Sequence, residues 1–256
     1  MLMIFSPMEQ FEVYNIFSFI GLYVTNFTLF AFLVVFFILG FYFFNNNGSN
    51  LIYNRLSIIT DIIYDSVYSL FIGQSSYTIY FPFIFTLFNF ILVSNLFGNI
   101  PMGFTISTSI IYTIGLSFII FISTFINSIM IYGIVFFANF IPNNTPFALL
   151  FILAPIEVIS YTAKAFSLGI RLLANMAAGH SLLHILAGFL FTLFTLNIFT
   201  AVLTIIPFAL FVAIVLLEIA VSFIQAYVFS ILTSSYINDS FNVHLFIYIP
   251  LFKIIW

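Results

Sequence analysis

The sequence carries very little charge and contains no cysteine. Charged side chains make up 4% of its 256 residues, whereas soluble proteins carry about 25% to solvate their surface. This deficit excludes a water-soluble domain. The four basic residues form no basic stripe, which excludes nucleic-acid binding. Without cysteine, the chain can form neither a disulfide framework nor a thiolate metal site.

A targeting signal is lacking as well. The N-terminal segment, residues 1–15, contains two acids and no basic residue. It therefore has neither the positive start of a secretory signal nor the arginines of a transit peptide. We expect the chain to be inserted where it is made. Its 40 phenylalanines against one tryptophan suit AT-rich coding, as in some organelle genomes, although lipid-facing positions also demand bulky apolar side chains.

Long apolar runs dominate what is present. The stretches 13–54 and 66–156 are each almost free of charge and exceed the about 20 residues that one helix needs to cross the hydrocarbon. They lack the alternating polar positions of a β-barrel strand. We therefore predict an all-α integral membrane protein with about five membrane helices and one amphipathic surface helix, forming a single domain over 1–256. The expected parts are a first span at 16–44, the amphipathic helix at 51–72, spans at 77–100 and 105–141, long helices at 146–196 and 198–236, and a C-terminal segment at 237–256.

The last two expected helices are too long to stand upright in a membrane. At 1.5 Å per residue they would measure roughly 75 and 60 Å, against a hydrocarbon thickness of about 30 Å. Either each helix breaks, with Pro155 and Pro207 as candidate kinks, or each is steeply inclined against a partner. The second alternative predicts a large neighbouring protein. We expect the two helices to form a tilted antiparallel hairpin that turns near 192–200.

Ionisable side chains inside a membrane cost about 2.5–3.5 kcal/mol each, so each one suggests a function. Four polar residues fall within roughly 40° of one another on one helix face, and we call them the polar seam: Glu157, Lys164, Arg171 and Asn175. Lys164 lies near one end, where it can snorkel or pair with Glu157 in a purely structural role. Small residues around the seam would let another helix approach closely: Ala163, Ser167, Ala174, Ala178 and Gly179.

Arg171 is the most informative member of the seam. It lies roughly 20 Å along the helix from Glu157, which is too deep for easy snorkelling, and its side chain stays charged because a guanidinium is not deprotonated in proteins. A permanent cation at this depth needs a carboxylate. That carboxylate could come from another chain.

His180 and His184 share a helix face, and His180 lies about half a turn around the helix from Arg171. We expect the pair to line a different cavity from Arg171. Three interpretations stay open. The pair could bind zinc, although no HExxH acid lies between them. They could be core histidines with satisfied hydrogen bonds. They could also relay protons, because histidine titrates near neutral pH, and this interpretation is favoured.

A second polar face lies on the last helix, where Glu218, Ser222 and Gln225 follow one another at helical spacing. Asp239 lies roughly 30 Å beyond Glu218. In the expected hairpin the two histidines and Glu218 lie toward the turn, whereas Glu157 and Asp239 lie toward the open end. Two polar clusters would face opposite sides of the membrane, with the arginine between them. This is the layout of two offset aqueous half-paths separated by a charge that hydrated protons cannot pass.

The stretch "PIEVISYTAKAFSLGIRLLANMAAGH" resembles subunit a of the F-type ATP synthase in its mitochondrial form. The segments "SPMEQFEV", "NLFGNIP" and "LLEIAVSFIQAYVFSIL" support the resemblance over most of the chain. The resemblance implies a proton-channel stator subunit in which Arg171 is the essential cation. It further implies that the proton path includes Asn95, Asn175, His180, Glu218 and Gln225.

The resemblance also implies partners and a location. The partners are a ring of proton-carrying subunits, a peripheral stalk, other membrane-sector subunits and lipids. The chain itself would be no enzyme, would bind no nucleotide and would require no cofactor, apart from the zinc alternative at the two histidines. The location is the mitochondrial inner membrane, with a bacterial plasma membrane less favoured. Two other functions stay open: a proton-pumping subunit of a respiratory dehydrogenase, which should show repeated buried Lys and Glu, and a structural membrane scaffold.

Overall fold

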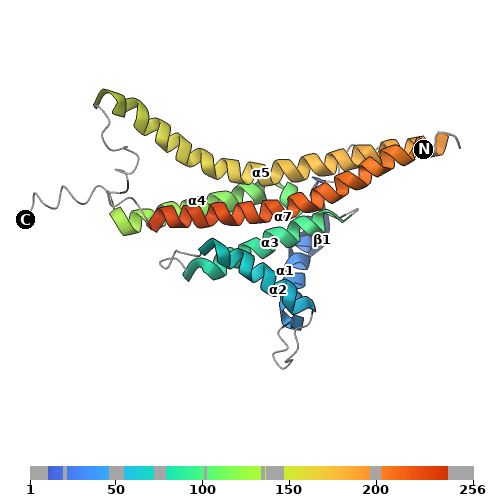
Figure 1. Cartoon of the computed structure of the whole chain (residues 1–256), viewed down its shortest axis with the longest axis horizontal. Coiled ribbons are helices and arrows are strands. Elements are labelled where there is room, and N and C mark those ends of the chain that lie inside the picture. Colours follow the sequence, from blue (N-terminus) through green and yellow to red (C-terminus); the bar gives the residue numbers. More distant parts are fainter. Residues whose placement is uncertain are drawn as a thin grey trace, which may run out of the picture.

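A computed structural model of the chain describes residues 11–19, 22–45, 55–71, 79–100, 103–133, 136, 147–196 and 203–241. Long helices dominate these residues (Figure 1). Five of them are long and apolar enough to cross a membrane, so the predicted all-α membrane fold is confirmed: α1 (Asn26–Asn45), α3 (Phe81–Gly98), α4 (Ile110–Tyr132), α5 (Phe147–Leu196) and α7 (Ile205–Phe241). The shorter elements are α2 (Arg55–Tyr68) and the 3₁₀ turns η2 (Ser69–Phe71) and η4 (Ile106–Thr108).

The prediction that the first span starts at residue 16 is wrong. The residues before α1 form two antiparallel strands, β1 (Asn15–Phe19) and β2 (Leu22–Thr25), in which Ser18 pairs with Tyr23. Aromatic and β-branched residues are frequent here and suit strands. The helix then begins at Asn26, whose Oδ1 accepts a 2.9 Å hydrogen bond from the Phe27 N–H. A side-chain oxygen at this position satisfies a backbone donor that the helix itself leaves unpaired.

The third span is shorter than the expected 105–141. Its first residues form η4, and α4 ends at Tyr132. Gly133 follows the helix and adopts a φ of 58° that glycine accepts without strain. The end of the expected span, 137–141, lies outside the described residues. In contrast, α7 continues to Phe241, past the expected end at 236. Its last turn is anchored because the Tyr132 hydroxyl donates a hydrogen bond to the Phe241 carbonyl.

The amphipathic helix predicted at 51–72 corresponds to α2 and η2, while residues 51–54 and 72 lie outside the described residues. Asp61 and Asp65 are exposed, and Val67 is fully buried. The ring of Tyr64 packs edge-on against Phe81 of α3, with 5.1 Å between the ring centroids. One face of α2 therefore packs on the helical core, whereas the exposed side carries Asp61 and Asp65 together with apolar residues such as Ile59 and Ile62.

Neither proline breaks the long helices. α5 continues through Pro155 as one 50-residue helix that is bowed along its length (Figure 1). Pro207 falls in the first turn of α7, where proline is tolerated. α1 runs across the direction of this long pair (Figure 1). With 20 residues, or a length of about 30 Å, an upright α1 matches the thickness of the hydrocarbon. If α1 crosses the membrane in this way, α5 and α7 are strongly tilted away from the membrane normal.

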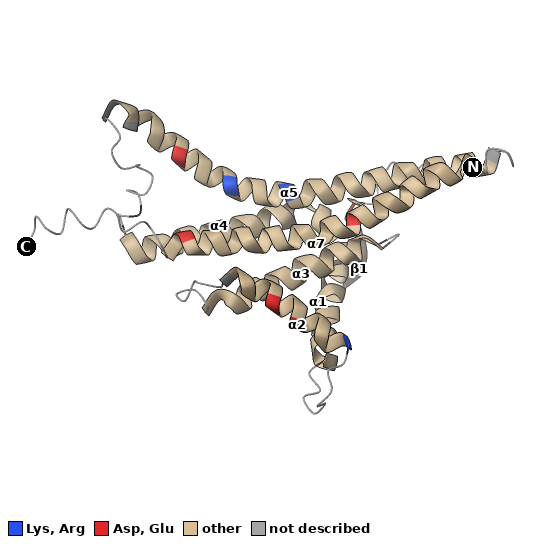
Figure 2. Cartoon of the chain, viewed as in Figure 1, with Lys and Arg blue, Asp and Glu red and all other residues tan. Residues whose placement is uncertain are grey.

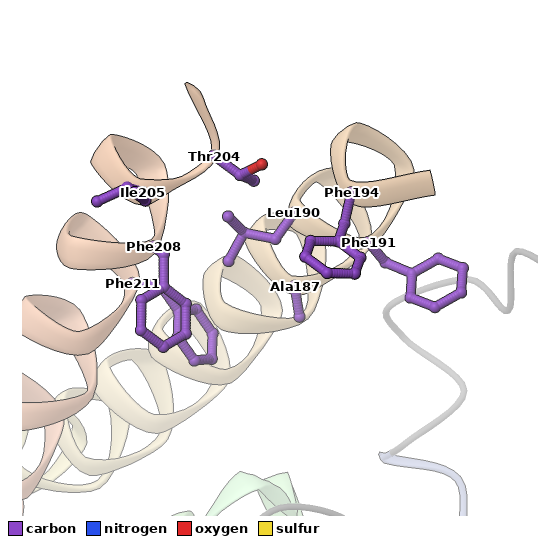
Figure 3. Close-up of a pocket in the computed structure, with 8 residues that line it drawn as sticks. All are labelled: Ala187, Leu190, Phe191, Phe194, Thr204, Ile205, Phe208 and Phe211. Carbon is purple, nitrogen blue, oxygen red and sulfur yellow. The ribbon is translucent and has the colours of Figure 1, made fainter. Parts of the chain in front are cut away.

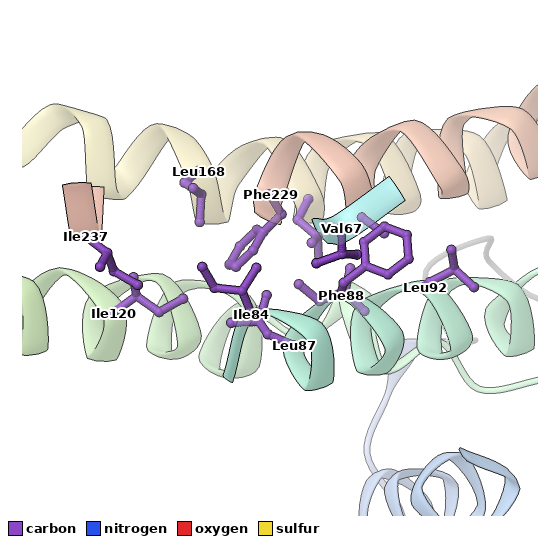
Figure 4. Packing of buried hydrophobic residues seen from close by; sticks show 12 residues of the cluster. Val67, Ile84, Leu87, Phe88, Leu92, Ile120, Leu168, Phe229 and Ile237 are labelled. Carbon is purple, nitrogen blue, oxygen red and sulfur yellow. The ribbon is translucent and has the colours of Figure 1, made fainter. Parts of the chain in front are cut away.

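The other helices pack on one side of this pair. α3 contacts α7 and α1, and α4 contacts both α5 and α7. The apolar core lies between α3, α4 and the long pair (Figure 4), and α2 covers it with Val67. At Gly169 the backbones of α4 and α5 come close, because a Cβ there would lie 2.7 Å from Ser117 Oγ and 2.9 Å from the Thr113 carbonyl oxygen. Glycine at this crossing allows the tight helix approach that membrane packing favours.

Candidate functional site

Arg171 lies at the middle of α5 with its side chain exposed. Within the described parts of the chain, its guanidinium forms no ion pair and no hydrogen bond. Only its backbone is engaged, because its carbonyl accepts a 2.9 Å hydrogen bond from Gln225 Nε2 of α7. This bond joins the backbone of Arg171 to α7. The side chain is exposed and borders a narrow cleft that residues of α7 also line. A permanent charge is thus presented on an outward helix face.

The rest of the polar seam lies on the same open face. Glu157, Lys164 and Asn175 are all exposed, as the sequence spacing predicts. The small residues around them are exposed too: Ala163, Ser167, Ala174 and Ala178. The charged residues occur singly along the long helices, with long uncharged intervals between them (Figure 2). This face of α5 is therefore open and carries the cation of Arg171 at its middle.

Gly179 does not belong to this open face, contrary to the sequence prediction. It points toward α7, and a Cβ there would collide with the Glu218 carboxylate oxygen Oε1 and lie 3.1 Å from Glu218 Cδ. The absence of a side chain at Gly179 thus gives the carboxylate its place between α5 and α7.

Glu218 belongs to a cluster of buried polar groups with unused hydrogen-bonding capacity. Glu218 is 8% exposed and Asn95 fully buried. Among the described residues, no hydrogen-bond partner is found for either Glu218 carboxylate oxygen, for His180 Nε2, or for either polar atom of the Asn95 amide. Each unsatisfied buried group costs about 1–3 kcal/mol. A fold tolerates such a cost where the groups have another task, and carboxylate and imidazole are suited to exchanging protons.

Asn99 is a member of this region that the sequence argument missed. Its Nδ2 donates a 2.9 Å hydrogen bond to Ser222 Oγ on α7, and its Oδ1 has no partner within the described chain. The sequence argument placed Asn99 only at the end of the expected span 77–100. The signal was present, however, because Asn99 lies four residues after Asn95 and so shares its helix face. Gly98, between them in sequence, lies beside His180 Nε2 and allows the close approach of Thr105, since a Cβ at Gly98 would lie 2.7 Å from Thr105 Cγ2.

A cavity of about 780 Å³ leads to this region, and we call it the His180 cavity. His180 and His184 line it from α5, and Asn99 lines it from the end of α3. Its other walls come from the segment around α1 and from α7, including Tyr14, Asn26, Phe30, Phe104 and Val215. Arg171 instead borders a separate narrow cleft with Gln225 and Phe229. The prediction that the two histidines line a different cavity from Arg171 is confirmed.

A second cavity, of about 420 Å³, lies between the C-terminal part of α5 and the start of α7 (Figure 3). Aromatic rings dominate its walls, including Phe191, Phe194, Phe208 and Phe211. It shares Ala187 and Phe211 with the His180 cavity but has no ionisable residue in its lining. It therefore offers no proton-exchanging group.

His184 is exposed in the His180 cavity. Across the described ranges, no group of three or more His, Cys, Asp or Glu residues comes together. Zinc usually takes four ligands, and at least three from protein in catalytic sites. The histidine pair alone does not complete such a set, and zinc binding at His180 and His184 stays a prediction.

The two acids expected at the open end of the hairpin do not lie together. The N-terminal part of α5, which carries Glu157, rises away from the C-terminal part of α7, which carries Asp239 (Figure 1). Both acids are exposed. Asp239 is near enough to Tyr161 and Tyr236 for its charge to act on both hydroxyls, and Tyr236 is near Arg171 as well. Tyr236 thus lies between Arg171 of the polar seam and Asp239 near the end of α7. The sequence analysis did not select this tyrosine.

Comparison with known proteins decides which family has this arrangement. The family model described as "ATP synthase A chain" matches residues 25–238. The chain belongs to the ATP synthase A chain family. It is 47% identical over 251 residues to ATP synthase subunit a of Mycosarcoma maydis, covering 94% of this chain and 99% of that relative. It is 40% identical over 249 residues to ATP synthase subunit a of Saccharomyces cerevisiae, covering 93% of this chain and 96% of the relative.

Membership of the ATP synthase A chain family confirms the resemblance seen in the sequence. The chain is a proton-translocating subunit of the ATP synthase membrane sector, and catalysis takes place on other subunits. Its fungal relatives and its five span-length helices make it a multi-pass protein of the mitochondrial inner membrane, as predicted. The respiratory dehydrogenase and scaffold alternatives lose their support.

Proposed function

We propose that the chain forms two offset aqueous half-paths against a rotating ring of carboxylate-bearing subunits, with Arg171 separating them. One observation carries the proposal: Arg171 is exposed at the centre of an open face, with no acidic partner among the described residues. A buried cation would need a carboxylate from its own fold. A cation on an open face with small neighbours can instead meet the carboxylate of a moving partner.

The uptake half-path runs through the His180 cavity. A proton reaches His180 from the cavity and passes by way of Glu218 to a ring carboxylate, with Asn95 and Asn175 lining the path and His184 at its exposed side. The unpartnered Nε2 of His180 and the unpartnered carboxylate of Glu218 support this route. Once neutral, the ring carboxylic acid loses most of the cost of facing lipid. The ring can then carry it away from the subunit.

The release half-path lies on the other side of Arg171. When the loaded carboxylate returns, the guanidinium favours its ionised form, and the proton leaves toward Glu157 and Asp239. Arg171 also stops protons from passing directly between the half-paths. Gln225 keeps this arrangement in register through its bond to the Arg171 carbonyl. A membrane potential supplies about 2.3 kcal/mol per charge per 100 mV, which ring rotation can deliver to distant catalytic subunits.

The proposal implies contacts outside this chain. The ring would dock on the open face of α5, and a peripheral stalk together with other membrane-sector subunits would hold the chain against the torque of the ring. Lipid would cover the remaining apolar surface. The steep inclination of α5 and α7 supports this arrangement, because an inclined 50-residue helix can follow the curved side of a ring over a long distance.

The test compares two cations of the polar seam in the intact complex reconstituted into vesicles. We expect Arg171→Ala to lower coupled ATP synthesis about 100-fold or more, the size of effect seen when a key electrostatic group is removed. Lys164→Ala is the matched control, because Lys164 is an exposed cation of the same face, and we expect synthesis to fall less than about twofold. Arg171→Lys should also fail, because a compact ammonium cannot replace the planar guanidinium. Coupled synthesis retained in Arg171→Ala would refute the proposal.

A further inference from the structure

The N-terminal segment contributes to the lining of the His180 cavity. Tyr14 and Asn26 line the cavity together with His180 and His184. Tyr14 precedes β1 and Asn26 begins α1, so neither belongs to the long helices that carry the ionisable residues. Phe30 and Phe104 line it as well, with their ring centroids 6.0 Å apart. The cavity therefore depends on a segment that has no ionisable residue of the proposed path.

Asn26 attaches this segment to α1 through three hydrogen bonds. Its Nδ2 donates to the Glu12 carbonyl at 3.0 Å, and its backbone N–H donates to the Tyr14 carbonyl at 3.1 Å. In return, its Oδ1 accepts the Tyr14 N–H at 3.2 Å. The same oxygen accepts the Phe27 N–H at the start of the helix. One side chain thus joins residues 12–14 to the first turn of α1 at the edge of the cavity.

We propose that Tyr14, held by Asn26, forms part of the wall of the cavity through which His180 takes up protons, and that Asn26 is a positioning residue for this step. The inference rests on the proposed role of His180 in proton uptake. Without the Asn26 bonds, the segment can move relative to α5 and change the width of the aqueous path. Asn26 does not itself exchange protons, because an amide has no titratable proton in this range.

The absence of cysteine from the chain permits a direct test in the reconstituted complex. Single variants Tyr14→Cys and Leu183→Cys each place one thiol in the lining of the cavity, since both residues line it. Tyr23→Cys is the control, because Tyr23 lies in β2, is 64% exposed and does not line the cavity. The probe is a bulky methanethiosulfonate reagent, and the unsubstituted complex serves as the blank for thiols on other subunits.

We expect the reagent to block proton uptake in Tyr14→Cys and Leu183→Cys, and to leave it unchanged in Tyr23→Cys and in the blank. Inhibition of Leu183→Cys alone overturns the inference and leaves the His180 path standing. If the reagent inhibits neither cavity variant, the inference is overturned as well, because the cavity would then carry no protons. The outcome for Arg171→Ala is independent of all of these results.

The positioning role of Asn26 needs a second comparison. We expect Asn26→Ala to lower the proton-uptake rate about tenfold, because a small displacement of the cavity wall disturbs the alignment of the groups that exchange protons. Asn26→Asp keeps the accepting oxygen and should recover most of the rate. Thr28→Ala is the control, because Thr28 Oγ1 donates to the Thr25 carbonyl at the same junction but does not line the cavity. Equal losses in Thr28→Ala and Asn26→Ala, or no recovery in Asn26→Asp, would overturn the positioning role.

Discussion

Single residues without ionisable groups determine where the ionisable ones lie. Arg171, His180 and Glu218 could be selected from the sequence, because charge and depth in an apolar helix are visible in residue types. Asn99 was missed although its spacing of four residues from Asn95 indicates a shared helix face. Gly179 was misread, because its role depends on a contact between helices that no spacing rule describes. Gly179 was counted among the small residues of an outward face, whereas it makes room for the Glu218 carboxylate.

Gly179→Ala tests this residue-scale requirement. The added methyl group would displace the carboxylate of Glu218, and we expect proton-uptake-limited ATP synthesis to fall about 10- to 100-fold, as for a displacement of about 1 Å at a reacting group. The measurement is synthesis by the reconstituted complex at a low proton driving force. Gly188→Ala is the control on the same helix, because a Cβ at Gly188 meets nothing within 4 Å. Equal rates for the two variants would show that Gly179 does not position the carboxylate.

At the scale of elements, long apolar patterns were easier to interpret than their ends. α5 was expected at 146–196 and is found at Phe147–Leu196, because turn residues bound its apolar stretch. The start of the first span was wrong, because an apolar run such as 16–25 suits a strand as well as a helix. The capping contact of Asn26 decides between them. The bow of α5 and its divergence from α7 (Figure 1) are features that periodicity does not encode.

The crossing of α4 and α5 leads to a prediction at the same scale. Gly169→Ala would push a Cβ against Ser117 and the α4 backbone at 2.7–3.1 Å, at an overpacking cost of about 1–3 kcal/mol. Alanine gains about 0.5–1 kcal/mol over glycine in a helix, so we expect a net loss of about 1–2 kcal/mol. The thermal midpoint of the purified complex, or the amount of assembled chain, reports it. Gly115→Ala has open space within 4 Å and should be neutral or stabilising; a matching loss there would contradict the packing explanation.

At the scale of the whole molecule, the fold is one-sided. α3 and α4 pack against one side of the α5–α7 pair and α1 packs on α3, whereas the polar seam and its small neighbours stay open on α5. Membrane helices gain little by burying apolar side chains, so their association depends on close packing of small residues. The sequence indicated this need for a large neighbour through the length of the helices. It could not indicate which face would stay open, because that depends on where the other helices pack.

The open face predicts that added bulk near Arg171 would separate the chain from the ring without unfolding it. Ala174→Leu places a large side chain on the exposed face of α5, and overpacking a tight helix contact costs about 1–3 kcal/mol, or roughly a 5- to 150-fold loss of ring affinity. Ring retention during purification and coupled ATP synthesis in vesicles measure the effect. Gly40→Leu is the control, because Gly40 lies on α1 and a Cβ there meets nothing within 4 Å. If Ala174→Leu keeps the ring and full synthesis, the ring docks elsewhere, because a partner seated on this face has no room for three additional carbon atoms between itself and α5.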